Sequence, residues 1–101
     1  MWMLVMFDLP VTSSNDKRHY RLFRELLLNE GFNMMQFSVY GRHCPSREKA
    51  ESKERRILRS LPPSGQVRIL SVTDAQYAKM RIFQETTRMQ AESRGEQLEF
   101  W

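Results

Sequence analysis

The sequence predicts an α+β domain in which an antiparallel sheet carries two helices on one face. Apolar runs that alternate like strands are interspersed with amphipathic runs of helical period, and Gly or Pro residues separate them. A length of 101 residues is enough for one hydrophobic core and too short for two. The expected order is strand, helix, one long strand or two short ones, helix, strand, which is the split βαβ pattern.

The first predicted strand, residues 2–7, is a run of large and β-branched side chains that ends at Asp8, Leu9 and Pro10. An apolar run of this length is typical of a central strand. Because side chains alternate along a strand, Asp8 is expected to emerge where one apolar face ends. That face carries Trp2, Leu4, Met6 and Asp8, and the opposite face carries Met3, Val5 and Phe7.

The first predicted helix begins after the possible N-cap residues Ser13, Ser14 and Asn15 and runs to Glu30. Ser13, followed three residues later by Asp16, has the spacing of a capping box, and an acidic side chain suits the positive end of the helix dipole. Gly31 is expected to end the helix in the left-handed conformation, which costs glycine nothing. The apolar stripe that faces the core consists of Tyr20, Phe23, Leu26 and Leu27.

The middle of the sequence predicts a strand region and a second helix. Residues 33–40 alternate either as one long strand or as two short strands joined near Gln36, and the pattern leaves both arrangements open. Pro45 and Ser46 begin a highly charged helix that stops before Pro62. Its thin apolar stripe places it on the outside of the sheet. The stripe consists of Ala50, Ile57, Leu58 and Leu61.

The remaining residues predict a last strand, a short helix and an apolar tail. Residues 67–73 alternate as a strand, and Thr73 or Asp74 caps a short helix. Residues 81–83 are expected to return as a brief strand. The apolar end of the chain, residues 98–101, is expected to pair with a sheet edge, and that edge can belong to a second copy.

Two helices can cover only one face of the predicted sheet. The other face would leave Trp2, Leu4 and Met6 in water, so pairing of two copies through this face is the simplest remedy. We therefore expect a homodimer whose C-terminal strand pairs with the partner protomer. Residues 1–83 are then one domain, and residues 84–101 are a connection and C-terminal strand of the same domain.

Composition and charge narrow the class of partner. A formal net charge of +4 and an isoelectric point near 9.6 favour an anionic partner. Cys44 is the only cysteine, so neither an internal disulfide nor a cysteine-based metal cluster can form, which fits a reducing cytoplasm. The apolar opening MWMLVMFDLP lacks the basic start and cleavage site of a signal peptide and the length of a membrane span, so no membrane partner is expected.

Four segments, taken in order, point to a known family. They are MFDLP at the end of the first strand, HYRLFRELLLNEGF, QFSVYGR and ILSVTDAQYAKM. Together they span roughly residues 2–83, and their joint order is specific although each segment alone is common. In this order the chain resembles the second family of CRISPR-associated proteins, "Cas-two", the small partner of the spacer integrase, and its type II branch in particular.

The resemblance implies a ferredoxin-like βαββαβ protomer whose homodimer sits between dimers of the CRISPR-associated integrase. In this role the dimer holds the double-stranded DNA of a prespacer during spacer acquisition and needs no chemistry of its own. Family members are also described as metal-dependent nucleases that act on RNA or duplex DNA. In that description, Asp8 and its copy in the second protomer approach each other across the two-fold axis and bind Mg²⁺.

Asp8 is therefore the candidate metal-binding and catalytic residue. One carboxylate per chain makes a poor magnesium site, because Mg²⁺ wants six oxygen ligands, although two symmetry-related carboxylates could anchor it. The alternative is a structural Asp8 whose oxygens cap the turn at Leu9 and Pro10. The first functional hypothesis is a structural adaptor for duplex DNA, the second is a Mg²⁺-dependent endonuclease, and a stand-alone RNA-cleaving toxin of related fold is a third.

Five basic residues are candidates for contact with a nucleic-acid backbone. They are Lys17, Arg18 and Arg21 on the first helix, and Arg42 and Arg47 after the strand region. Contacts of this kind position phosphates and read no bases. The alternative is an ordinary solvated helix flank, which the sequence alone does not exclude.

Overall fold

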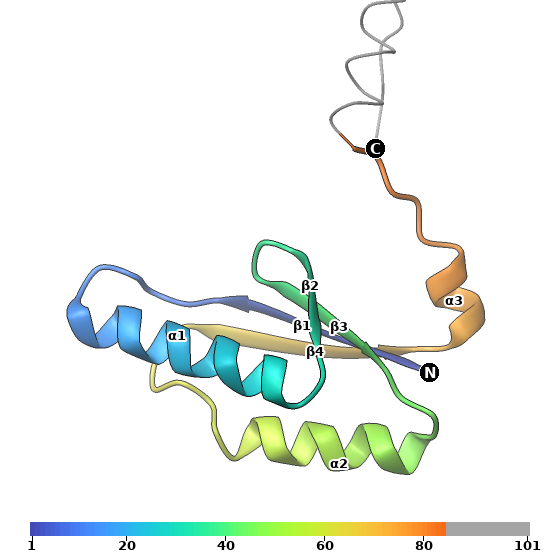
Figure 1. Cartoon of the computed structure of the whole chain (residues 1–101), viewed down its shortest axis with the longest axis horizontal. Helices are drawn as coiled ribbons and strands as arrows, with labels where there is room; N and C mark the ends of the chain where they lie inside the picture. Colours follow the sequence, from blue (N-terminus) through green and yellow to red (C-terminus); the bar gives the residue numbers. More distant parts are fainter. Residues whose placement is uncertain (85–101) are drawn as a thin grey trace, which may run out of the picture.

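The computed structural model describes residues 1–84 as a sheet with helices packed on one side. The strands follow the order β2-β3-β1-β4, and each neighbouring pair is antiparallel. α1 and α2 lie on the same side of this sheet (Figure 1). The predicted α+β, ferredoxin-like class is confirmed. The elements are β1 Trp2–Asp8, α1 Ser14–Asn29, β2 Asn33–Gln36, β3 Val39–His43, α2 Arg47–Leu58, β4 Gln66–Val72 and α3 Asp74–Ala78.

β1 is the central strand, as predicted, and its alternation separates the two faces of the sheet. Met3, Val5 and Phe7 are buried beneath α1 and α2. The side that α1 and α2 leave uncovered is called the open face, and at one end of it Tyr77 of α3 stacks on Trp2. Cross-strand pairing places the β4 and β3 partners of Leu4 and Met6 on this same face. The open face carries Trp2, Leu4, Met6, Asp8, Val39, Gly41, His43, Gln66, Arg68, Leu70 and Val72.

The region that the sequence left open is two strands. β2 and β3 are joined by a tight turn at Phe37 and Ser38, and Ser38 has a φ of 63°, an uncommon value for a residue other than glycine. The Ser38 carbonyl accepts a hydrogen bond from the backbone N–H of Phe7 at 3.1 Å. The turn is thus fixed to the middle strand of the sheet.

The core fills the space between the sheet and the two long helices. Phe23 and Leu27 of α1 are buried, and Tyr20 and Leu26 pack against the core, so the predicted α1 stripe is confirmed. On α2 the prediction is only partly right, because Leu58 and Leu61 are 54% and 44% exposed. Leu58 is the last residue of α2 and Leu61 follows the helix, so both lie beyond its last buried residue, Ile57. The buried residues are Met3, Val5, Phe7, Leu9, Phe23, Leu27, Phe32, Tyr40, Cys44, Ala50 and Ile57.

The helix starts follow the predicted caps. The Ser13 Oγ accepts a hydrogen bond from the Asp16 N–H at 3.0 Å, and the Asp16 carboxylate accepts one from the Ser13 N–H at 3.2 Å. This is the predicted capping box. Ser46 caps α2 by accepting a hydrogen bond from the Lys49 N–H. Local sequence alone therefore fixes where both long helices begin.

The C-terminal part of the described chain differs from the prediction. Residues 81–84 form neither a strand nor a helix. After α3 the chain runs away from the sheet (Figure 1). The predicted tail at residues 98–101 lies outside the described residues. Within residues 1–84, no helix has both the length and the apolar character needed to cross a membrane.

Gly31 provides a test of how α1 is joined to the sheet. It has a φ of 88°, and a Cβ added there would collide with the guanidinium group of Arg42. We expect Gly31→Ala to lower the free energy of unfolding by about 1–2 kcal/mol, measured by urea denaturation, because alanine is strained in this conformation. Arg42→Ala should lower the free energy of unfolding by less in the Gly31→Ala protein than in the wild type. A Gly31→Ala protein as stable as the wild type would contradict this account.

Candidate nucleic-acid interface

Asp8 lies at the end of β1 on the open face and is exposed to solvent. Its partner across the strand pair is Gln66 of β4. The backbone at this point is held closely, because a Cβ added at Gly65 would lie 2.5 Å from the Asp8 carbonyl oxygen. Within residues 1–84, the Asp8 carboxylate has no hydrogen bond or ion pair with another group. The structure therefore leaves this carboxylate available for a ligand.

A shallow hollow of about 290 Å³ surrounds Asp8 and is called the Asp8 hollow. It combines one carboxylate with the side chains of Ser38, Gln66 and Arg68 and the ring of Phe37. Its full lining is Met6, Phe7, Asp8, Phe37, Ser38, Val39, Gln66 and Arg68.

The side chains that one protomer places around Asp8 do not suit a magnesium ion. The hollow supplies one carboxylate, and the guanidinium group of Arg68 lies in the same lining. Among residues 1–84, no group of three or more His, Cys, Asp or Glu side chains could hold a metal. Asp16 is engaged as the α1 cap, and Asp74 lies at the opposite end of β1, so neither joins Asp8. Mg²⁺ would need oxygen ligands from a second chain in addition to the Asp8 carboxylate.

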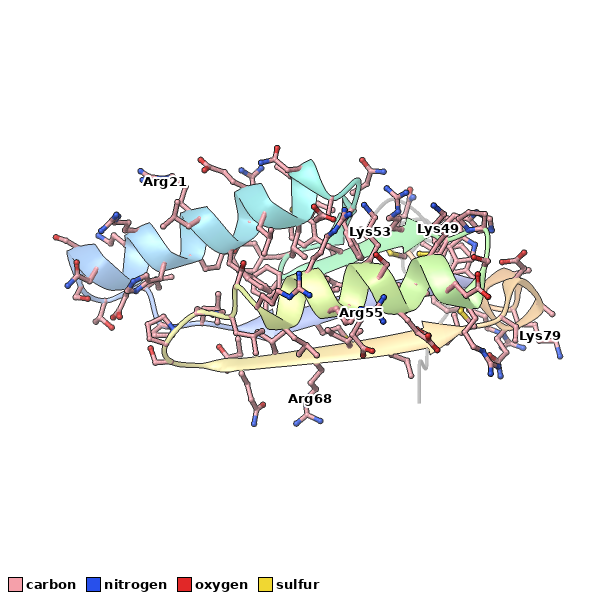
Figure 2. The ribbon with its side chains drawn as sticks, turned by 90° about the horizontal axis from the view of Figure 1, so that it is seen from below. Arg21, Lys49, Lys53, Arg55, Arg68 and Lys79 are labelled. Carbon is pink, nitrogen blue, oxygen red and sulfur yellow. The ribbon has the colours of Figure 1, made fainter. Side chains whose placement is uncertain are left out.

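Lys17, Arg18 and Arg21 are exposed on the side of α1 that faces away from the sheet, and this surface is called the α1 basic side. Figure 2 shows Arg21 directed away from the sheet. Glu25 lies 3.8 Å from Arg21, a long and exposed pair that leaves the charge of Arg21 largely available. The surface presents clustered positive charge suited to phosphates.

Arg42 occupies a different setting from the α1 basic side. It is half-buried, and its Nη1 donates a hydrogen bond to the Glu30 carbonyl oxygen at 2.9 Å, which caps the C-terminal end of α1. Its Nε is buried and has no hydrogen-bond partner among residues 1–84. Arg42 therefore joins β3 to α1.

The Glu30 carboxylate binds two further cations. It accepts hydrogen bonds from Lys53 at 3.0 Å and Arg56 at 3.1 Å, both on α2. Hydrogen bonding to Lys53, reinforced by Arg56, holds the pKa of Glu30 below its ordinary value of 4.5. This one carboxylate thus offsets part of the charge of Lys53 and Arg56, while Lys49 and Arg55 of α2 stay exposed.

Arg47 is exposed at the start of α2, at the opposite end of the sheet from Lys17. Its neighbours in a surface depression include Met1 and Ser71, whereas α1 begins beyond the far end of β1. The Cys44 N–H donates a hydrogen bond to the Met1 carbonyl at 2.8 Å, which fixes the start of α2 near the start of β1. The five basic residues proposed from sequence therefore do not form one patch.

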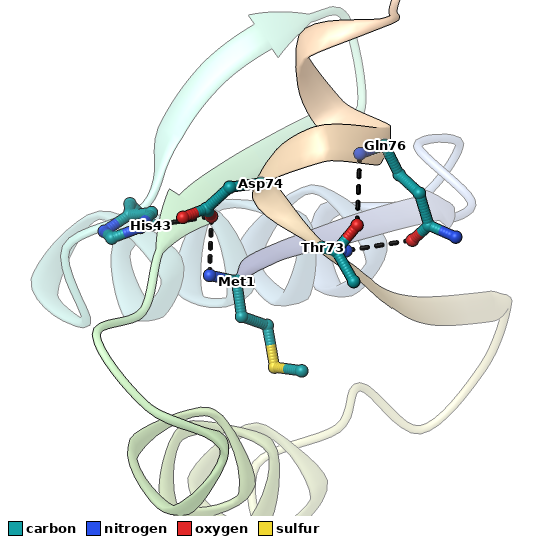
Figure 3. A network of polar contacts seen from close by, with 5 residues as sticks. All are labelled: Met1, His43, Thr73, Asp74 and Gln76. Carbon is teal, nitrogen blue, oxygen red and sulfur yellow. Dashed lines mark hydrogen bonds and ion pairs between the residues drawn. The ribbon is translucent and has the colours of Figure 1, made fainter.

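A network of polar contacts lies at the Met1 end of the sheet (Figure 3). The Asp74 carboxylate accepts a hydrogen bond from the Met1 amine at 2.6 Å and lies 3.3 Å from His43 Nε2. The hydrogen bond from the amine lowers the pKa of Asp74. Thr73 and Gln76 form a reciprocal capping box at the start of α3. Asp74 and His43 thus have a structural explanation within this network.

Sequence reasoning did not single out Phe37 or Arg68. Arg68 enters the Asp8 hollow only because β4 pairs with β1 in a register that places it opposite Met6. The alternating pattern places Phe37 in a strand, but the turn after Gln36 removes it from the sheet. A correct pairing of the two strands would have found Arg68, since alternation on β4 is visible in the sequence.

Known proteins with a similar sequence or fold identify the family of this chain. The family model described as CRISPR associated protein Cas2 matches residues 1–80. The chain belongs to the Cas2 family. The crystal structure of Streptococcus pyogenes Cas2 at pH 6.5 is similar, with a TM-score of 0.63 and 14% sequence identity over 83% of this chain and 100% of that chain. At this identity the similarity supports the fold.

Curated relatives extend the comparison along the sequence. The CRISPR-associated endoribonuclease Cas2 of Acidovorax ebreus (strain TPSY) is 50% identical over 82 residues, which cover 81% of this chain and 80% of the relative. The protein of the same name from Flavobacterium psychrophilum (strain ATCC 49511 / DSM 21280 / CIP 103535 / JIP02/86) is 39% identical over 101 residues, which cover 100% of this chain and 88% of that one. Both names describe these relatives as endoribonucleases.

The Glu30 contacts predict a pH dependence of stability. Because the folded protein holds the pKa of Glu30 below 4.5, its contribution is complete above that value and is lost as the pH falls through the lowered pKa. We expect Glu30→Gln to lower the free energy of unfolding at pH 7 by about 1–2 kcal/mol and to flatten its pH dependence below pH 4.5. Urea unfolding from pH 3 to 7 tests this, with Glu25→Gln as the control for loss of one exposed carboxylate on α1.

Proposed function

We propose that the chain is a cytoplasmic, homodimeric subunit of CRISPR adaptation that binds duplex DNA. The dimer positions prespacer DNA between copies of the CRISPR-associated integrase during spacer acquisition. The observation that carries this proposal is the α1 basic side, where Lys17, Arg18 and Arg21 are exposed together on the surface of α1 that faces away from the sheet. Membership in the Cas2 family connects this surface to CRISPR systems.

The open face supports the homodimer. Leu70 is 49% exposed, and Trp2, Leu4, Met6 and Val72 beside it are only half-buried. Leu4, Met6 and Leu70 form an apolar centre on this face, and a second copy of the same face covers it most simply. The pair would carry twice the formal charge of +4, which strengthens attraction to a polyanion.

The α1 basic side gives a test of duplex binding. We expect the triple variant Lys17→Gln, Arg18→Gln, Arg21→Gln to bind a fluorescent DNA duplex at least about tenfold more weakly at 0.15 M salt. The slope of log K against log salt should become less negative by about 0.9 for each phosphate that the variant no longer neutralises.

The matched control removes the same charge elsewhere. Lys49→Gln, Arg55→Gln, Lys79→Gln also replaces three exposed cations, which lie away from Arg21 (Figure 2). This control should retain most of the affinity. Equal losses in the two triple variants would show that net charge, and not the α1 basic side, determines binding.

The second candidate function is a Mg²⁺-dependent endonuclease acting on RNA or duplex DNA. The observation that favours it is the exposed Asp8 carboxylate, which has no partner within residues 1–84. In a homodimer joined through the open face, two Asp8 carboxylates would supply the ligands that one chain lacks. Bound Mg²⁺ would stabilise the negative charge that develops on a phosphodiester. The endoribonuclease names of the relatives agree with this candidate.

Substitution of Asp8 separates the two functions. We expect Asp8→Asn to remove Mg²⁺-dependent cleavage of RNA and duplex DNA while it leaves the dimer mass unchanged in sedimentation. Spacer integration in vitro by the cognate integrase should depend on this protein and be supported normally by Asp8→Asn.

Glu25→Gln is the control for this experiment, because it removes an exposed carboxylate of α1. Loss of integration with Asp8→Asn, with the dimer intact, would make the metal site part of adaptation. Integration that proceeds without the protein would overturn the adaptation proposal. A monomeric wild-type protein would contradict the role given to the open face.

A further inference from the structure

Arg68 carries a positive charge on the open face that has no acidic partner within residues 1–84. It is exposed on β4, and Figure 2 shows it directed away from the side that carries the helices. It forms no ion pair with the described residues, and its Nη2 donates a long hydrogen bond of 3.4 Å to Gln66 Oε1. Such a bond at an exposed site leaves the guanidinium charge largely unsatisfied.

The open face holds one carboxylate as well. β1 contributes Asp8 and β4 contributes Arg68, while His43 lies at the opposite end beside Asp74. Arg68 is opposite Met6, two positions along β4 from the partner of Asp8, so the two charges are diagonal neighbours on adjacent strands. They form no ion pair within one chain. Both charges are therefore available to a second copy.

A second copy on the open face would bring both charges into the contact. They lie beside the apolar centre formed by Leu4, Met6 and Leu70, which that copy would cover. A charge that loses water without meeting an opposite charge costs much more free energy than one in an ion pair. The contact is therefore stable only if Asp8 and Arg68 find counter-charges across it.

Two-fold symmetry supplies each charge with its opposite. In an isologous contact, a residue that meets a second residue of the partner is itself met in the same way, so a contact between Asp8 and the partner's Arg68 occurs twice. Facing sheets lie about 10 Å apart. Two carboxylates that face each other repel, whereas arginine carries its charge on a long stem that can reach a carboxylate across this gap.

We propose that, in the homodimer, Arg68 of each protomer binds the Asp8 carboxylate of the other and neutralises it in the absence of metal. Guanidinium and carboxylate groups form strong pairs of defined geometry, so these contacts also fix how the two sheets align. The inference rests on the proposed pairing of two copies through the open face. It also deepens the second candidate function, because Mg²⁺ would have to displace a guanidinium group from Asp8.

Charge reversal at the two positions tests the pairing. The dissociation constant of the dimer is measured by fluorescence-detected sedimentation, and folding is checked by circular dichroism. We expect Asp8→Arg and Arg68→Asp each to weaken the dimer at least about tenfold, because four like charges then meet. The double variant should return to within about threefold of the wild type. Reversal is needed because the side chain of Asp8→Asn still offers an oxygen to the guanidinium group.

The matched controls reverse the same charges on the helix side. Arg55→Asp changes an exposed cation of α2, and Glu25→Arg changes an exposed carboxylate of α1. Neither should change the dissociation constant by more than about twofold, because long-range effects between exposed charges are screened by salt. Equal weakening by these controls would assign the effect to net charge and overturn the proposal.

Mixing the two single variants shows whether the ion pair joins two chains. A heterodimer of Asp8→Arg with Arg68→Asp has opposite charges at both contacts, whereas each homodimer has like charges. We therefore expect native mass spectrometry to find the heterodimer in clear excess over a random mixture. An ion pair within one chain would stay broken in both variants, and mixing would not restore it. A random mixture of the three dimers would overturn the proposal.

Mg²⁺ gives a readout that needs no charge reversal. Arg68→Gln removes the guanidinium charge and leaves the carboxylates of the two Asp8 residues without it. We expect millimolar Mg²⁺ to tighten the Arg68→Gln dimer at least about threefold and the wild-type dimer by less, since the wild-type carboxylates are already bound. A larger effect of Mg²⁺ on the wild type would mean that Asp8 binds metal in preference to Arg68, and would overturn the proposal.

The remaining outcomes separate this contact from the wider function. A wild-type dimer that every substitution of Asp8 and Arg68 leaves unchanged would overturn the ion pair and leave the homodimer intact. A monomeric wild-type protein would contradict the proposed homodimer and the ion pair together. The double variant should bind a DNA duplex as the wild type does, because the α1 basic side lies on the other side of the sheet.

Discussion

The packing around Phe7 holds together the parts of the fold on which the candidate sites depend. The centroid of its ring lies 5.2 Å from that of Phe23, 5.8 Å from that of Tyr20 and 5.6 Å from that of Tyr40. One side chain of β1 therefore joins α1 and β3. Its backbone N–H also holds the β2–β3 turn through Ser38. Because Asp8 is the next residue, the core fixes both the direction of the carboxylate and the turn beside it.

Alternation along β1 explains why the functional candidates lie on two different faces. Phe7 points into the core, so Asp8 must point to the open face, while α1 carries its cations outward on the helix side. A duplex bound on the α1 basic side of one protomer therefore does not lie over Asp8 of that protomer. The proposed phosphate-binding surface and the Asp8 carboxylate therefore lie on separate faces, and substitutions can test them separately.

Local signals in the sequence were enough to predict most of the fold. The capping box at Ser13, the glycine stop at Gly31 and the alternation of β1 are all short-range patterns, and the structure confirms each. The brief strand predicted for residues 81–83 was wrong, because the direction that the chain takes after α3 is not encoded locally. Leu58 is exposed for a similar reason: helical spacing predicts which side of α2 is apolar, but not how far along the helix that side stays covered.

The candidate sites were harder to predict because they depend on contacts between distant residues. Arg42 resembled the other cations in sequence, yet in the fold it caps α1 through the Glu30 carbonyl, and Lys53 and Arg56 are taken up by the Glu30 carboxylate. Net charge therefore overstates the positive surface available on α2. What remains available is set by which cations lack an internal carboxylate. Within residues 1–84 these include Lys17 and Arg18 on α1 as well as Lys49 and Arg55 on α2, so the two helices differ in how their cations are grouped and not in whether any are free.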